Sequence, residues 1–417
     1  MTLEKWLSRI ESLHSHTIVM GLERVRAIAA SLNLSHFSCP VILIGGTNGK
    51  GSSVKFVASI LQANGYQVGT YTSPHLLHFN ERICINDQPV TDEILSDAFE
   101  VIDRARQTVV LTFFEFTTLA ALWIFKQAKL DALILEVGMG GRLDAVNIVE
   151  ADIAVVTSVD MDHMEWLGET REEIGYEKAG IFKPTKVAIC GDLFPPESVK
   201  QRARDLACPF YCIGKDFSFE RDNNSWSWHS TDLIFEHLPI PRLSLTNAAI
   251  ALMVISKLQE RLPVSFAAVR EGLQQAALPG RFQKIGKIIL DVAHNPAAAA
   301  MLANNLNQLN HNGRLIGVVG MLADKDISAT LQPLFPLIQE WHLGTLSVKR
   351  GAEATLLARS FKDIPNVNCY TYDAISSAFN AASNNATTND KIIVFGSFYT
   401  VAEVLSVLSS QVNLCSE

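Results

Sequence analysis

The segment Val41–Ser53, VILIGGTNGKGSS, constrains the fold more than any other part of the chain. Its apolar start predicts a buried parallel strand, and a glycine-rich turn then leads into a helix that we expect to open at Lys50. Backbone N–H groups in such a turn cradle phosphate, and a lysine can reach the outer phosphates. The match to G-x-x-x-x-G-K-[ST] is imperfect because Gly51 separates Lys50 from Ser52. The alternative is a tight turn whose glycines serve geometry only, but it would leave Lys50 and the paired serines unexplained.

Composition narrows the class of protein. The chain has 417 residues, of which 48% are hydrophobic and 19% charged, so it can form two domains with full cores. A net charge of -8 argues against a nucleic-acid groove and against an anionic membrane surface as partners. The start, Met1–Trp6, is not typical of a signal peptide, and no apolar run reaches the roughly 18 residues of a membrane span. Seven irregularly spaced cysteines, an odd number, favour a reducing cytoplasm.

Strand-like apolar runs alternate with helical patterns, which favours an α/β fold with a mostly parallel sheet and helices on both faces. The first expected strands are 41–44, 67–71, 132–137, 153–158 and 187–190. The expected helices are 52–64, 91–106, 114–127, 170–179 and 245–262. The polar, Trp-rich stretch Asp216–His237 contains short alternating runs, so we expect a small antiparallel excursion there.

A second βα series follows Leu278–Gln283, where the helix signals stop. Its expected strands are 288–292, 315–319, 340–343, 367–370 and 392–395. We therefore predict a mostly parallel-sheet P-loop ATPase domain over residues 1–284, followed by a smaller Rossmann-like α/β domain over residues 285–417.

Polar side chains follow several of the expected strands, at the edge where open α/β sheets bind ligands. Besides the glycine-rich turn, these are Ser73, Glu136 and His163. Each has an ordinary alternative: Ser73 could cap a turn, Glu136 could pair with a buried cation, and His163 could be a satisfied loop histidine. Together, beside a phosphate loop, they indicate a Mg²⁺–ATP site, although imidazole is the least typical Mg²⁺ ligand.

Ordered motifs run through essentially the whole chain. They are GTNGKGS (46–52), SPHL (73–76), EVGMGGRLDA (136–145), DHMEWLG (162–168), EKAGI (177–181), LPGRF (278–282), DVAHNP (291–296), DKD (324–326) and FGSF (395–398). On these motifs the chain resembles the folylpolyglutamate synthase/dihydrofolate synthase family, the folate branch of the Mur ligase superfamily. The phosphate loop alone is shared by all Mur-type ligases, whereas the glycine after Lys50 is typical of the folate branch.

The resemblance implies roles for residues of both domains. Lys50, His163 and Lys178 would be catalytic, and Lys178 matches a lysine that is carbamylated in the superfamily and helps to hold a second Mg²⁺. Without the resemblance, Lys178 would be taken for a lysine on a helix surface. The first Mg²⁺ would be held by Ser73, Glu136 and His163. The residues implied to bind ATP are Thr47, Asn48, Gly49, Lys50, Gly51, Ser52, Asn247, Arg281, Asp291 and His294.

The implied substrate residues are less generic. Phe114 could stack on a pterin ring, and Asp144 could bond its amino-pyrimidine edge. The alternative for Phe113 and Phe116 is a helix start that buries aromatic rings in the core. Lys325 and Ser397 would face the incoming glutamate. The residues implied to bind pteroate are Val19, Met20, Gly21, Thr112, Phe113, Phe114, Glu115, Leu143, Asp144 and Ala145.

The resemblance implies an ATP-dependent ligase that joins L-glutamate to dihydropteroate, giving dihydrofolate, and to reduced folates, giving folylpolyglutamates, through an acyl phosphate. An enzyme restricted to polyglutamylation is the nearest alternative. A Mur-type ligase on a cell-wall precursor would be expected to carry a UDP-binding domain before the phosphate loop. A non-enzymatic nucleotide-binding module is disfavoured because Lys50, Glu136, His163 and Lys178 are all present. The expected protein is a cytoplasmic monomer with small-molecule partners.

Overall fold

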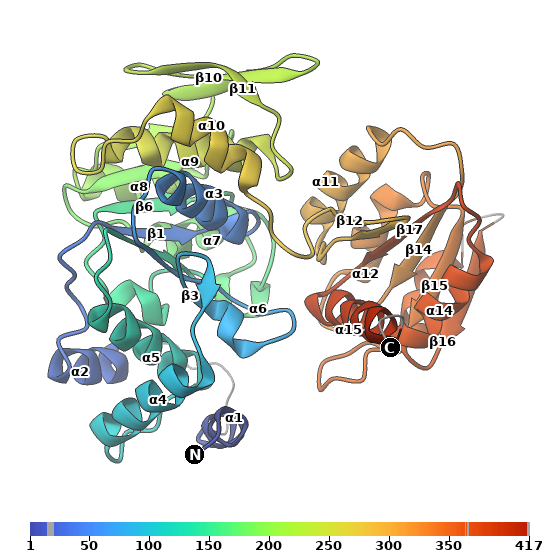
Figure 1. The fold of residues 1–417 in the computed structure, drawn as a ribbon, viewed down its shortest axis with the longest axis horizontal. Coiled ribbons are helices and arrows are strands. Elements are labelled where there is room, and N and C mark those ends of the chain that lie inside the picture. Colours follow the sequence, from blue (N-terminus) through green and yellow to red (C-terminus); the bar gives the residue numbers. More distant parts are fainter. Residues whose placement is uncertain (15–20, 363, 365–366, 415–417) are drawn as a thin grey trace. The chain divides into compact units, whose positions relative to one another are not determined.

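The computed structural model describes residues 1–14, 21–362, 364 and 367–414, with side chains described through residue 410. Two compact units make up the chain (Figure 1). Unit 1 contains residues 1–75 and 79–276, and unit 2 contains residues 76–78 and 277–417. The boundary drawn from the sequence, between residues 284 and 285, stays a prediction.

An eight-stranded sheet forms the centre of unit 1, in the order β4-β3-β2-β5-β1-β6-β7-β8. The strands from β2 to β8 in that order are parallel, and β3 and β4 add an antiparallel edge. The bounds are β1 Val41–Gly45, β2 Val68–Tyr71, β3 Ile83–Ile85, β4 Gln88–Pro89, β5 Ala132–Glu136, β6 Ile153–Val156, β7 Val187–Cys190 and β8 Phe210–Cys212. The predicted parallel α/β sheet is therefore confirmed.

Burial explains why these strands form where they do. Every residue of β1 and β5 is buried, as expected for apolar runs in a parallel sheet that is covered on both faces. The covering helices and short 3-10 turns of unit 1 are α1 Leu3–Ser12, α2 Glu23–Ser31, α3 Lys50–Ala63, η1 Phe79–Arg82, α4 Asp92–Arg106, α5 Phe113–Gln127, η2 Ala145–Ile148, α6 Met164–Leu167, α7 Arg171–Ala179, α8 Glu197–Asp205, α9 Leu245–Leu258 and α10 Phe266–Gln275. Helix α3 begins at Lys50, as the sequence predicts.

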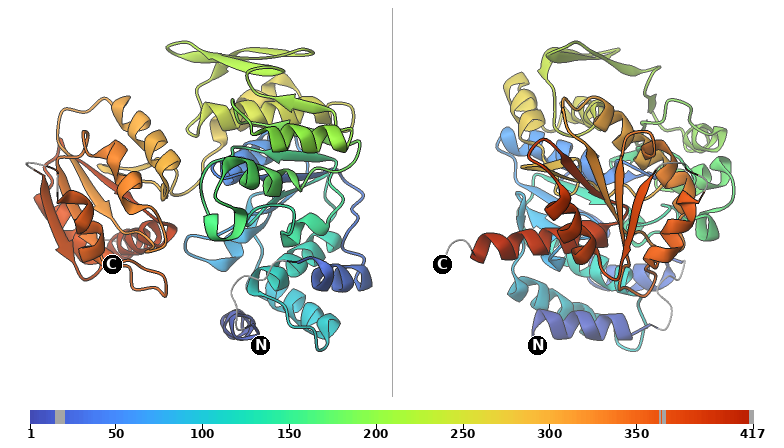
Figure 2. Two further views of the ribbon diagram at one scale, coloured as in Figure 1. Left: turned by 180° about the vertical axis from the view of Figure 1, so that it is seen from behind. Right: turned by 90° about the vertical axis from the view of Figure 1, so that its right-hand side faces the viewer.

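The Trp-rich stretch forms a separate three-stranded antiparallel sheet, in the order β11-β10-β9. Its strands are β9 Phe217–Arg221, β10 Ser225–Ser230 and β11 Ile234–Pro239, and it lies over α9 and α10 (Figure 2). Trp226 and Trp228 alternate with polar residues and are fully buried, and the Trp228 indole donates to the Ala249 carbonyl oxygen at 3.1 Å. The predicted antiparallel excursion is therefore present.

Helix α9 is shorter than expected. It ends at Leu258 rather than Leu262. Pro263 disfavours the helical conformation at Leu262, and residues 259–261 before it form a turn.

Unit 2 has a six-stranded sheet in the order β12-β13-β17-β14-β15-β16. All neighbours are parallel except β12 and β13. The strands are β12 Gln283–Ile285, β13 Ile288–Leu290, β14 Leu315–Val319, β15 Glu340–Gly344, β16 Asn368–Tyr372 and β17 Lys391–Phe395. The helices and 3-10 turns are α11 Pro296–Asn307, α12 Ile327–Leu331, η3 Gln332–Leu334, α13 Ala354–Ala358, η4 Arg359–Phe361, α14 Ile375–Asn385 and α15 Phe398–Leu414.

The helices of unit 2 form two cores, one on each face of its sheet. Residues of α11, α12 and α13 share one apolar cluster, and residues of α14 and α15 share the other. This two-sided cover confirms the predicted second α/β unit. In the part of the chain that the structure describes, no helix has the length and apolar character to cross a bilayer.

Candidate active site

Four neighbouring strands of unit 1 end at the same edge of the sheet, in the order β2-β5-β1-β6. Glu136 is the last residue of β5, and the loops after the other three strands carry Ser73, the phosphate loop and the segment with His163. The carboxyl edge of an open α/β sheet is where ligands bind, so the structure brings these segments together as the sequence predicts.

Two glycines of the phosphate loop are required by space as well as by backbone conformation. Gly46 has φ +140°, and a Cβ there would lie 1.9 Å from Thr157 Oγ1. Gly49 has φ +87°, and a Cβ there would lie 2.4 Å from Asn247 Oδ1. Asn247, in the first turn of α9, therefore lies against the loop, although it is about two hundred residues away in sequence.

The loop is tied to the segment that follows β6. Thr157 Oγ1 donates to the Asn48 carbonyl oxygen at 2.7 Å, and Asn48 N–H donates to Ser158 Oγ at 3.0 Å. Thr47 Oγ1 accepts the Asp160 N–H at 3.0 Å. Sequence reasoning missed Thr157 and Ser158, whose signal was two hydroxyl residues directly after a buried strand.

Lys50 opens α3 and folds back over the loop. Its Nζ donates to the carbonyl oxygens of Gly46 at 3.0 Å and Thr47 at 3.3 Å. Gly51 and the buried Ser52 continue the first turn. The positive charge is thus held at the loop and the helix N-terminus, where a phosphate would be attracted.

Of the predicted metal ligands, Glu136 is buried and His163 is exposed. Glu136 ends β5 with 5% of its surface exposed, and its Oε2 accepts the Ser73 N–H at 3.3 Å. His163 is exposed, with φ +52° and ψ +39°. The described residues contain no group of three or more His, Cys, Asp and Glu side chains suited to a metal ion. Glu136 and Ser73 are neighbours, whereas a Mg²⁺ site that also includes His163 stays a prediction. Hydroxyl, carboxylate and imidazole groups can bind Mg²⁺ together with phosphate and water.

Lys178 is a buried residue of α7, with 4% of its surface exposed. The alternative of a surface lysine is therefore wrong. Burial, with the positive charge of Lys50 as a second cause, lowers the Lys178 pKa to about 7, while Asp162 acts in the opposite direction. A large fraction of this amine is consequently uncharged near neutral pH, which is the form that can attack CO₂.

Two of the predicted pteroate residues form the N-terminal cap of α5. Thr112 Oγ1 accepts the Glu115 N–H at 3.3 Å, and Glu115 Oε2 accepts the Thr112 N–H at 2.8 Å. The other Glu115 oxygen accepts Arg24 Nη2 at 2.7 Å. The structure thus gives both residues a role in folding, whatever else they contact.

The aromatic rings after this cap lie in different surroundings. Phe114 is partly buried and stacks on Tyr71, with ring centroids 6.0 Å apart and planes at 28°. Phe113 is partly buried and meets Phe79 edge to face at 6.0 Å. Phe116 is fully buried in the core, so the core interpretation is confirmed for this ring.

Asp144 is a buried carboxylate that organises its own loop. Its Oδ2 accepts the Met139 N–H at 2.9 Å, and its Oδ1 accepts the Val146 N–H at 3.0 Å. Burial raises the Asp144 pKa to about 6, against the lowering effect of these backbone donors. Leu143 and Ala145 flank it in the chain. Of the remaining pteroate candidates, Gly21 is described, whereas Val19 and Met20 lie outside the described residues.

Three predicted nucleotide residues gather in unit 2. The Arg281 guanidinium lies over the Phe398 ring at 5.0 Å, and the His294 ring centroid is 6.3 Å from the same ring. The Asp291 carboxylate accepts the N–H groups of Phe282 at 2.9 Å and Ala293 at 2.8 Å. The Phe398 ring therefore contacts both Arg281 and His294, although no sequence-based prediction placed Phe398 in the site.

The predicted glutamate residues come from adjacent strands of unit 2. Lys325 lies in the turn after β14, and Ser397 follows β17 after Gly396. Ser397 is buried, and its Oγ accepts the Thr400 N–H at 3.0 Å. Thr400 Oγ1 donates to the Gly320 carbonyl oxygen at 2.7 Å, which links the two loops.

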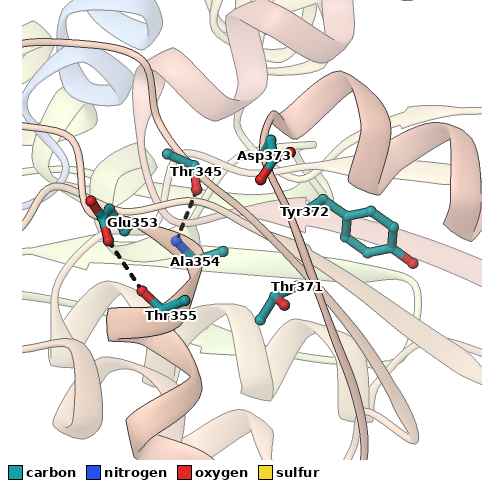
Figure 3. Close-up of a pocket in the computed structure, with 7 residues that line it drawn as sticks. All are labelled: Thr345, Glu353, Ala354, Thr355, Thr371, Tyr372 and Asp373. Carbon is teal, nitrogen blue, oxygen red and sulfur yellow. Dashed lines mark hydrogen bonds between the residues drawn. The ribbon is translucent and has the colours of Figure 1, made fainter.

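A pocket of about 410 Å³ opens at the carboxyl ends of β15 and β16 (Figure 3). Within it, Thr345 Oγ1 accepts the Ala354 N–H at 3.0 Å. Neither Lys325 nor Ser397 lines this pocket. Its lining residues are Thr345, Glu353, Ala354, Thr355, Thr371, Tyr372 and Asp373.

Comparison with known families matches both parts of the chain. Residues 44–214 match the Mur ligase middle domain, and residues 280–398 match the glutamate ligase domain of Mur ligases. The dihydrofolate synthase/folylpolyglutamate synthase of Escherichia coli K12 is 42% identical over 98% of this chain and 96% of its own length.

Solved structures agree with these matches. Escherichia coli FolC in complex with DHPP and ADP aligns with a TM-score of 0.95 at 42% identity, over 99% of this chain and 98% of that one. A bifunctional folylpolyglutamate synthase/dihydrofolate synthase with Mn, AMPPNP and L-glutamate bound aligns with a TM-score of 0.92 at 43% identity, over 98% of both chains.

Proposed function

Because the chain belongs to the Mur ligase family, in the branch of the dihydrofolate synthase/folylpolyglutamate synthases, we propose that it joins L-glutamate to dihydropteroate and to reduced folates at the expense of ATP. One observation carries the proposal. A relative of that name aligns over nearly its full length with this chain, and the phosphate loop, Glu136 and the buried Lys178 of this chain all belong to unit 1. ATP and a divalent cation are the co-substrate and cofactor; one related structure contains ADP, and another contains Mn and AMPPNP.

The reaction begins when a substrate carboxylate attacks the γ-phosphate of ATP. The N–H groups of the phosphate loop and the Lys50 ammonium hold the phosphate oxygens and stabilise the charge that develops on them. A Mg²⁺ held by Ser73, Glu136 and His163 would neutralise further charge on the phosphates. The products of this step are ADP and an acyl phosphate.

The second step forms the amide bond. The amine of L-glutamate attacks the acyl carbon, and the tetrahedral adduct collapses with loss of phosphate and of the amine's proton. Because acyl phosphates hydrolyse, water must be kept from the carbonyl until the amine arrives. Lys325 and Ser397 are proposed to hold the glutamate, and Arg281, Asp291 and His294 the nucleotide.

Lys178 is proposed to act as a carbamate. Its uncharged amine adds to CO₂ and releases a proton, which converts a cationic side chain into an anion. A buried lysine with a pKa of about 7 supports this step, because an ordinary lysine is almost wholly charged at neutral pH. The carbamate would then help to hold a second cation. Native mass spectrometry in bicarbonate should show a carbon dioxide adduct that Lys178→Met lacks.

A substrate panel tests the proposed activity. Purified protein with ATP, Mg²⁺ and labelled glutamate is offered dihydropteroate, tetrahydrofolate, and its mono- and diglutamates. We expect phosphate release only when both glutamate and one of these acceptors are present. Turnover of folates without any turnover of dihydropteroate would leave a polyglutamate synthase, and no glutamate incorporation with any acceptor would refute the proposal.

The chain is further proposed to be a monomeric cytoplasmic enzyme. The six cysteines that the structure describes are all free thiols, which supports a reducing compartment. Sedimentation of the purified protein at micromolar concentration should give a mass near 45.8 kDa. A concentration-independent dimer mass would contradict the monomer.

A further inference from the structure

The loop that carries His163 is held by an ion pair that the reaction itself does not use. We infer that Arg171 and Asp192, together called the loop clamp, are positioning residues that set the metal affinity of the proposed site. The inference rests on the proposed function only in taking His163 as a metal ligand. Its geometry belongs entirely to unit 1.

Both members of the clamp form hydrogen bonds with the backbone of Val159. Arg171 Nε donates to the Val159 carbonyl oxygen at 2.9 Å, and Asp192 Oδ2 accepts the Val159 N–H at 2.9 Å. Arg171 Nη2 closes the triangle by donating to the same Asp192 oxygen at 2.9 Å. Both hydrogen-bonding groups of one loop residue are thereby fixed, four residues before His163.

The clamp is anchored at its far side as well. Asp192 Oδ1 accepts the Phe194 N–H at 2.9 Å, and Arg171 Nη2 also contacts the Phe194 carbonyl oxygen at 3.2 Å. Arg171 is 43% exposed and Asp192 11%. Solvent screens such a pair, so its effect should come from the fixed geometry of the guanidinium rather than from Coulomb attraction.

A second constraint meets the loop one residue later. Asp160 N–H donates to Thr47 Oγ1 at 3.0 Å, and Thr47 belongs to the phosphate loop. The segment between β6 and α6 is therefore held on one side by the phosphate loop and on the other by the clamp. This arrangement keeps the proposed phosphate and metal groups in fixed register.

The backbone of His163 shows why such support is needed. His163 has φ +52°, in the left-handed region, which is uncommon for residues other than glycine although histidine adopts it more often than most. Such a conformation persists only when the surrounding structure determines it. Arg171 is also the first residue of α7, the helix that carries Lys178 two turns later. The Arg171 side chain thus connects the first residue of the lysine helix to the histidine loop.

A purely structural role is the competing explanation, and metal binding separates the two. We would measure Mn²⁺ affinity in the presence of ADP from the electron paramagnetic resonance signal of free Mn²⁺, together with thermal midpoints. Arg171→Gln should weaken Mn²⁺ binding roughly tenfold, as is usual when a residue that orients metal ligands is lost. The matched control is Arg204→Gln, which breaks an exposed ion pair with Glu197 on the neighbouring helix α8 and should leave Mn²⁺ affinity unchanged.

A conservative variant tests geometry against charge. Arg171→Lys keeps the charge but cannot bond Val159 and Asp192 together in one plane, so it should bind Mn²⁺ nearly as weakly as Arg171→Gln. In the double variant with Asp192→Asn, the two losses should not add, because both act through one loop. With active enzyme, the Mg²⁺ concentration for half-maximal rate should rise while the KM for the pteroate substrate stays constant.

The outcomes separate this inference from the proposed function. Wild-type affinity for Mn²⁺ in Arg171→Gln, or an equal loss in Arg204→Gln, would overturn the clamp. If wild-type protein did not bind Mn²⁺ with ADP at all, the metal assignment and the clamp would fall together. If it bound Mn²⁺ but ligated no glutamate, the proposed function would fail while the Mn²⁺ affinities still decided the clamp.

Discussion

At the scale of single residues, two lysines of opposite character stand at the proposed site. Lys50 is held at the phosphate loop by carbonyl oxygens, so its charge is kept where phosphate would bind. Lys178 is buried, and its pKa is lowered to about 7 chiefly by that burial. The two cations are close enough that Lys50 contributes to the lowering. One lysine is therefore suited to electrostatic stabilisation, and the other to covalent modification.

Lys50→Ala should lower kcat by at least roughly 10²-fold, because it removes charge stabilisation from the phosphoryl transfer. The fold should survive, since the Lys50 ammonium contacts backbone carbonyl oxygens of its own loop. Lys55→Ala is the control. Lys55 is a cation of the same helix, but it pairs with Asp87 and does not contact the phosphate loop carbonyl oxygens that Lys50 contacts. Near-normal turnover by folded Lys50→Ala, measured as phosphate release, would exclude Lys50 from the mechanism.

Lys178 should give the protein a distinctive pH dependence of stability. Its pKa of about 7 in the folded protein lies below the ordinary value of 10.5. Between pH 7 and pH 10.5 the unfolded chain therefore binds more protons than the folded protein does. Stability relative to Lys178→Met should therefore rise as pH increases from about 7 to 10.5, and should be constant below 7. Urea unfolding of both proteins in CO₂-free buffer measures this difference, and parallel curves would show that Lys178 is not buried as an amine.

At the scale of secondary structure, local patterns were enough for most elements. The buried runs of β1 and β5 and the helix beginning at Lys50 follow from apolar sequence and glycine placement. The predicted end of α9 at Leu262 was wrong, because the helix stops at Leu258 although no proline occurs before position 263. Contacts between distant parts of the chain could not be predicted from such local patterns. Asp160 bonds Thr47 across 113 residues, and a sequence carries no local sign of that bond.

The substrate residues show the same limit. Thr112 and Glu115 fit a pteroate motif, but the same spacing is a capping box, and the structure realises the cap. Phe398 belonged to a recognised motif, yet its contacts with Arg281 and His294 depend on how β17 lies beside β13. Spacing can thus nominate a residue, whereas its neighbours come only from the folded chain.

The cap of α5 can be tested apart from substrate binding. Thr112→Ala should lower the free energy of unfolding by about 1 kcal/mol, because the Glu115 N–H loses its acceptor. Thr112→Ser keeps the hydroxyl and should unfold like wild type. Urea denaturation gives the stabilities, and KM values for dihydropteroate show any further role. Unchanged stability in Thr112→Ala would mean that the cap contributes nothing.

At the scale of the whole molecule, two parallel sheets divide the proposed chemistry within one chain. Phosphate, metal and carbamate groups belong to unit 1, and the proposed glutamate residues belong to unit 2. Except for Lys178, which lies in α7, these residues lie at or beyond the carboxyl ends of strands, where open α/β sheets bind ligands. The proposed site has one phosphate loop, and this loop must serve every acceptor that the enzyme uses.

That requirement leads to a prediction about the two acceptors. Dihydropteroate presents a benzoate carboxylate, whereas a folate presents the carboxylate of an attached glutamate several bonds further from the pterin. If Phe114 forms a pocket for the pterin of the shorter substrate, Phe114→Ala should reduce dihydrofolate synthesis more than polyglutamylation. Phe114 suits this test because it is only partly buried against Tyr71 and Gly138. Phe116→Leu, a core change on the same helix, should lower stability without altering the ratio of the two activities. An equal loss of both activities in Phe114→Ala would place the pterin of dihydropteroate elsewhere in the protein.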